Sequence, residues 1–166
     1  MKRAALSLLM LATALPVHAF DADEYRAIVS DTIVQVNSGN IDVAALQENQ
    51  KQLMAIGMEA AKEYAAEHPE SAELMNFVAD NADSMLEMNL EELETAWHDG
   101  EIYGDAGIDI DAYDHFGEEL GITESIVHPA TAYVALGEYG RTGDDMNLMQ
   151  VKDELSAAVE HMDHMH

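Results

Sequence analysis

Apolar residues recur every three to four positions along almost the whole chain after residue 20, and this spacing limits its fold more than any other feature. Such a period places apolar side chains on one face of an α-helix, whereas a half-buried strand would alternate. The last segment of this kind carries Leu148, Val151, Leu155, Val159 and Met162. We therefore expect an all-α fold, an antiparallel bundle of four to five main helices joined by short links.

Capping residues and breakers divide this pattern into segments. Asp21 or Asp23 can open the first helix, which Gly39 can close. Asn89 followed by Glu92 forms a capping-box pattern at the start of a short helix. The expected helices cover about residues 21–39, 42–68, 71–85, 89–100, 126–139 and 148–162. The helix over 126–139 would carry Pro129 near its first turn, where proline is tolerated.

Residues 100–122 interrupt the helical period, because glycines punctuate a strongly acidic stretch. We expect a Gly/Asp-rich loop here, with at most a short helix after Asp111. A loop of more than about a dozen residues in a compact domain is more often functional than idle. This segment is therefore a candidate functional region.

The first nineteen residues have the features of a secretory signal peptide. Lys2 and Arg3 precede an apolar run over residues 4–15, and Val17-His18-Ala19 offers small residues at the cleavage positions. The apolar run is too short for a membrane-spanning helix, which needs about 20 residues. We predict a signal peptide at 1–19 and a single acidic domain at 20–166 that is periplasmic or secreted and does not insert into the membrane after cleavage.

Charge and the lack of cysteine exclude several classes of function. Without Lys2 and Arg3, the seven basic residues become five, and they face 33 acidic ones. Such a surface repels nucleic acid and attracts cations or a basic partner protein, although acidity can also reflect solubility in a saline habitat. The chain has no cysteine, which rules out disulfides, covalently attached haem and thiolate metal sites.

The C-terminal end gathers possible metal ligands. Met162 falls on the apolar face of the last helix, whereas His161 and His164 lie off that face and Met165 follows His161 by four residues. We therefore expect His161, His164 and Met165 to form an exposed cluster. Imidazole and thioether donors suit copper in either oxidation state. The alternative is an exposed helix end at which histidine complements the helix dipole.

A second group of histidines surrounds the glycine-rich segment. His98, His115 and His128 each follow an acid by four residues, in turn Glu94, Asp111 and Glu124. On a helix that spacing places a carboxylate one turn before the imidazole, either as a second ligand or as its orienting partner. Two or three histidines and an acid would satisfy zinc or copper, although so acidic a chain also produces this spacing by chance. The C-terminal ligands and these histidines would form one site if the last helix packs beside the Gly/Asp-rich segment.

These observations favour an exported acidic bundle that binds copper or zinc as a chaperone, buffer or tolerance factor. No G-x-S-x-G, phosphate-binding glycine loop or H-E-x-x-H motif supports catalysis. One alternative is an interaction module that docks or inhibits a basic partner protein. Another is a bundle that binds non-covalent haem or a small ligand through a methionine and a histidine. The sequence leaves the physiological ligand and the oligomeric state open.

Overall fold

The computed structural model describes residues 20–113 and 117–163, and within these ranges it contains helices and no strand. The main helices are α1 (Ala22–Ser38), α2 (Val43–Glu67), α3 (Ala72–Met85), α6 (Glu118–Thr142) and α7 (Asp145–Met162). Between α3 and α6 lie the short α4 (Leu90–Leu93), a π-helical turn η1 (Glu94–His98), α5 (Glu101–Ala106) and a 3-10 turn η2 (Ile110–Ala112). The predicted all-α bundle is confirmed, while the predicted signal peptide lies outside the described residues.

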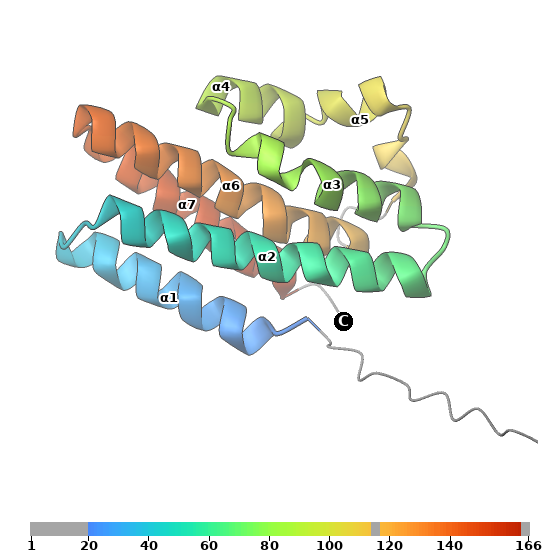
Figure 1. Ribbon diagram of the computed structural model, residues 1–166, viewed down its shortest axis with the longest axis horizontal. Coiled ribbons are helices and arrows are strands. Elements are labelled where there is room, and N and C mark those ends of the chain that lie inside the picture. The colour runs from blue at the N-terminus through green and yellow to red at the C-terminus, as the bar shows by residue number, and fades with distance from the viewer. Residues whose placement is uncertain (1–19, 114–116, 164–166) are drawn as a thin grey trace, which may run out of the picture.

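Helix α6 is the centre of the bundle (Figure 1). It contacts α2, α3, α4 and α7, while α1 packs against α2 and α7. Almost every residue of α6 from Gly121 to Leu136 is buried. A helix surrounded in this way is buried on most sides rather than along one stripe, and this stretch also carries polar residues such as Ser125 and His128. The chain from α4 to α5 covers the bundle on the side of α3 and α6.

The predicted caps are formed. The Asp21 side chain accepts a hydrogen bond from the Glu24 amide at 2.9 Å, and Gly39 ends α1 in the left-handed conformation. Asn89 and Glu92 make the reciprocal capping box at the start of α4. These local interactions satisfy backbone amides that would otherwise lack partners at helix starts. They explain why the helix boundaries at these positions were readable from the sequence.

The loop expected at 100–122 is shorter than predicted, because α5, η2 and the beginning of α6 all lie within it. Gly100 and Gly107 adopt left-handed backbone conformations on either side of α5, so glycine here separates short helices instead of preventing them. Gly117 then caps α6, whose first turn carries Glu118 and Glu119. Acidic residues stabilise a helix start through its dipole.

The predicted position of Pro129 near a helix start is wrong, because α6 begins at Glu118 and Pro129 lies inside it. An interior proline has no amide hydrogen and leaves the carbonyl four residues earlier without its helical partner. That carbonyl belongs to Ser125, and the fully buried Tyr25 hydroxyl of α1 donates a hydrogen bond to it at 2.9 Å. A tertiary contact from α1 thus compensates the break and keeps α6 continuous.

Helix α2 approaches α6 closely at Gly57. A Cβ atom at this position would lie 2.6 Å from Ser125 Oγ and 2.7 Å from Ile126 Cγ1. Any side chain larger than hydrogen would therefore force Ser125 and Ile126 to shift. This contact and the Tyr25 hydrogen bond fix the middle of α6 from two sides.

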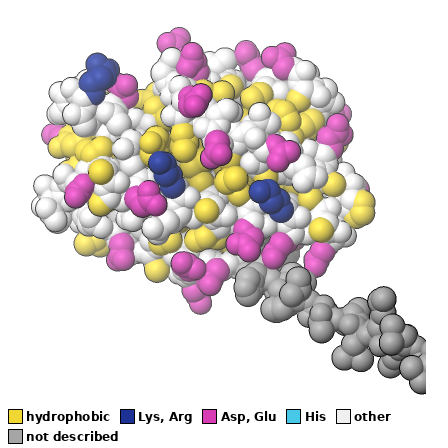
Figure 2. Space-filling view, in the orientation of Figure 1, with side chains coloured by type: hydrophobic (Ala, Val, Ile, Leu, Met, Phe, Trp, Pro, Cys, Tyr) yellow, Lys and Arg dark blue, Asp and Glu magenta, His cyan; other side chains and the backbone are white. Residues whose placement is uncertain are grey.

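Acidic side chains are scattered over the face shown in Figure 2 and are not gathered into one patch, with only a few basic side chains among them. Charge alone therefore marks no particular docking surface on this face. Within the described residues, no helix has both the length and the apolar character required to cross a membrane.

Candidate metal centre

His98 is held beside α6 by the π-helical turn η1. The preceding residue, Trp97, is buried, and its ring meets Tyr103 edge-on with ring centroids 5.7 Å apart. This anchor directs His98 toward α6, where its Nε2 atom lies 3.0 Å from Thr131 Oγ1. π-Helical turns are rare and occur frequently at functional sites. The turn therefore orients a histidine across the interface between η1 and α6.

Glu124, His128 and Thr131 lie on one face of α6 because they are four and three residues apart. His128 Nε2 is 3.3 Å from Glu124 Oε2, which confirms the predicted acid four residues before this histidine. The corresponding acid of His98, Glu94, is exposed. His98 instead contacts Thr131 of α6 and Glu154 of α7. Only one of these two spacings brings the carboxylate against the imidazole, as an ion pair when His128 is protonated.

Helix α7 contributes Glu154, a residue that the sequence analysis missed. Its Oε2 atom accepts a hydrogen bond from His128 Nδ1 at 2.8 Å and lies 3.8 Å from His98 Nε2. The Glu154 side chain is only 13% exposed, so these contacts are largely shielded from solvent. Glu154 precedes His161 by seven residues, which is two helical turns, and this spacing was the available sequence signal.

The hydrogen-bond partners favour one tautomer of each histidine. Thr131 Oγ1 donates its single proton to the Val127 carbonyl at 3.1 Å, so it accepts from His98 Nε2–H. His128 Nδ1–H donates to Glu154. In their neutral forms, His98 Nδ1 and His128 Nε2 therefore keep free electron pairs. A metal-binding histidine characteristically donates its second ring N–H to such an outer partner.

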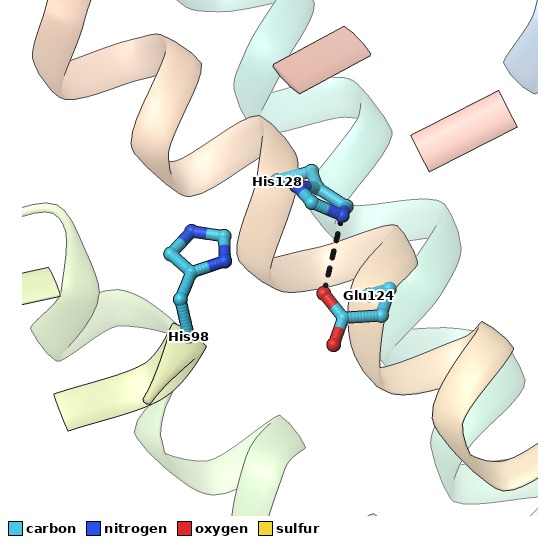
Figure 3. A group of neighbouring side chains, drawn as sticks. All are labelled: His98, Glu124 and His128. Carbon is cyan, nitrogen blue, oxygen red and sulfur yellow. Dashed lines mark ion pairs between the residues drawn. The ribbon is translucent and has the colours of Figure 1, made fainter. Parts of the chain in front are cut away.

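Two buried atoms of this group lack hydrogen bonds within the described residues, Glu124 Oε2 and His128 Nε2. Their separation of 3.3 Å is close to the spacing of two ligand atoms on one tetrahedral zinc ion, about 3.4 Å for bonds of about 2.0–2.1 Å. Together with His98 they form a group whose ligand atoms all lie within 4.8 Å of one another. Figure 3 shows the three side chains facing a common space between η1 and α6. The cluster could hold a metal ion.

Electrostatics also favours a cation here. The ion pairs of Glu124 and Glu154 are made with histidines, which are charged only when protonated. Two partly buried carboxylates beside neutral imidazoles would leave an uncompensated negative charge, which is costly. Burial by itself would lower the pKa of His128, but the hydrogen bond to Glu154 and the charges of Glu124 and Glu154 outweigh it and raise the pKa. Either a proton or a metal ion can supply the missing positive charge.

The structure brings together three of the six predicted ligands, namely His98, His128 and His161. The His161 ring packs on the His128 ring with centroids 5.5 Å apart and an angle of 26° between the planes, and it is half-buried rather than exposed as predicted. Met162 is buried in the core as expected. His115, His164 and Met165 lie outside the described residues.

The His98–Glu124–His128 cluster suits an ion better than an organic molecule. The side chains of His98, His128 and Glu124 are only 16%, 9% and 23% exposed, and they close on one another between helices. A cleft of about 730 Å³ lies elsewhere, between α4 and α5, and none of its lining residues belongs to the cluster.

Comparison of the chain with models of protein families, with curated proteins and with solved structures gives no match. The functional argument therefore rests on the geometry of the cluster.

Proposed function

We propose that this protein is an exported metal-binding protein that holds copper(II) or zinc between η1 and α6, as a chaperone, buffer or tolerance factor. His98, His128 and Glu124 would be the ligands. The observation that carries the proposal is the pair of buried atoms Glu124 Oε2 and His128 Nε2, which lie at ligand–ligand distance without hydrogen bonds in the described structure.

The chemistry of the donors supports this choice of metals. Two imidazoles and one carboxylate suit zinc and copper(II), whereas copper(I) prefers the sulfur donors that these residues lack. Glu154 and Thr131 would orient the two rings from outside, as partners of metal-binding histidines do. A divalent ion would also balance the charges of Glu124 and Glu154.

The proposal is tested by titrating metal-free protein with zinc and with copper(II). We expect one tightly bound ion in the wild type, and His98→Ala and His128→Ala should each weaken binding by about 100-fold or more, because loss of a ligand costs at least as much as loss of an outer partner. His68→Ala is the matched control, since this ring stacks on Tyr64 and takes no part in the cluster. Wild-type binding no tighter than that of His128→Ala would refute the proposal.

A further inference from the structure

The ring of His161 lies next to the proposed ion site from the side of α7. Its centroid is 5.5 Å from that of His128, and the centroid of His98 is 5.2 Å from that of His128 on the side of η1. His161 and Glu154 are two turns apart on α7, so the helix that supplies the orienting carboxylate also carries this third ring. In the described residues, the two imidazoles next to His128 therefore come from different elements, His98 from η1 and His161 from α7.

These spacings put a third imidazole next to the proposed ion. A zinc–nitrogen bond of about 2.0–2.1 Å places the metal about 3.2 Å from an imidazole centroid, so two such rings on a tetrahedral ion have centroids about 5 Å apart. The separations of 5.2 and 5.5 Å are close to this value. The His161 ring is stacked on His128 and lies outside the group of ligand atoms within 4.8 Å of one another, so it has to turn to reach the ion. We infer that His161 is the fourth ligand and completes a tetrahedral site of three histidines and Glu124.

This inference rests on the proposed function and makes it more specific. Closed four-coordinate sites hold a metal without an open position for a substrate, whereas catalytic sites retain one for water or substrate. A closed site of three nitrogens and one oxygen would sequester an ion rather than activate it. Turning the His161 ring from its stack on His128 toward the ion would also tie the end of α7 to η1.

The test uses cobalt(II) and copper(II) as spectroscopic probes of the whole protein and of His161→Phe. Phenylalanine keeps an aromatic ring over His128 but offers no nitrogen. We expect strong visible absorption of tetrahedral cobalt(II) in the wild type and a marked loss of intensity in His161→Phe. Electron paramagnetic resonance of bound copper(II) should report three nitrogens in the wild type and two in the variant. Zinc affinity should fall at least about tenfold.

Controls separate this inference from the proposed function. His68→Phe should leave every spectrum unchanged, and thermal unfolding of the metal-free variants shows whether each remains folded. A His161→Ala variant distinguishes loss of a ligand from a clash caused by the phenyl ring. If both His161 variants keep the wild-type cobalt spectrum and affinity while His128→Ala loses them, the fourth-ligand assignment is wrong and the proposed function stands. If His128→Ala also binds normally, both fail.

Discussion

Two acids of α6 only five residues apart, Glu119 and Glu124, sit in contrasting surroundings. Glu119 Oε1 accepts hydrogen bonds from the hydroxyls of Tyr64 at 3.1 Å and Ser71 at 2.8 Å, which link it to the chain around the α2–α3 connection. Glu124 faces the His128 ring, and its buried Oε2 atom has no hydrogen bond within the described residues. The first carboxylate is satisfied by proton donors, whereas the second is not.

The contrast shows that acidic density does not mark a cation site in this chain. Burial would raise the pKa of Glu119, but its own backbone amide, the hydroxyls of Ser71 and Tyr64 and the nearby His68 outweigh burial and lower it. Glu119 is therefore a stable anion that joins structural elements without a metal. Glu124 lies among imidazoles with free electron pairs, and this combination distinguishes the candidate site.

Exchanging each carboxylate for an amide tests the difference between Glu119 and Glu124 most directly. We expect Glu124→Gln to weaken zinc binding by about 100-fold or more, because it removes the only anionic ligand of the proposed site. Glu119→Gln, five residues earlier on the same helix, should leave the zinc affinity unchanged. Isothermal titration calorimetry of both variants measures the difference. Equal affinities for the two variants would show that Glu124 is not a ligand.

Much of this arrangement followed from local sequence signals. The caps at Asp21 and Asn89, the core position of Met162 and the pairing of Glu124 with His128 depend on residues within one or two turns of each other. Such spacing is fixed by helix geometry and can be read from one sequence.

The remaining features depend on tertiary contacts, which periodicity does not encode. Pro129 is tolerated inside α6 because Tyr25, a hundred residues earlier, reaches the Ser125 carbonyl. Glu154 belongs to the site because α7 packs along α6, and the π-helical turn at His98 carries Trp97, which packs against Tyr103. Glycine-rich composition also suggested more loop than the chain contains, because glycine separates short helices there.

Removing the Tyr25 hydroxyl should destabilise α6 at Ser125, the residue next to Glu124. Tyr25→Phe leaves the Ser125 carbonyl without a donor, and a buried unsatisfied group of this kind costs about 1–3 kcal/mol. The free energy of unfolding, measured with urea on metal-free protein, should fall by that amount. Tyr139→Phe, on the partly exposed side of α6, serves as the control. Equal stability of Tyr25→Phe and the control would mean that the carbonyl is satisfied in another way.

The smallest effect that we expect is on the loss of folding stability in acid, through the hydrogen-bonded carboxylate of Glu119. Because the pKa of Glu119 is lower in the folded protein than in the unfolded chain, its contribution to stability is present above the unfolded pKa and is lost as the pH falls through the folded pKa. Glu119→Gln removes this dependence, so the wild type should lose more stability than the variant between about pH 5 and about pH 3. The difference should be smaller than that expected for Tyr25→Phe, because Glu119 is partly exposed and solvent screens its interactions. Glu118 is exposed on the same turn, so Glu118→Gln serves as the control and should behave like the wild type. If the stability of Glu119→Gln falls with pH in parallel with both, the two hydroxyls do not stabilise the anion.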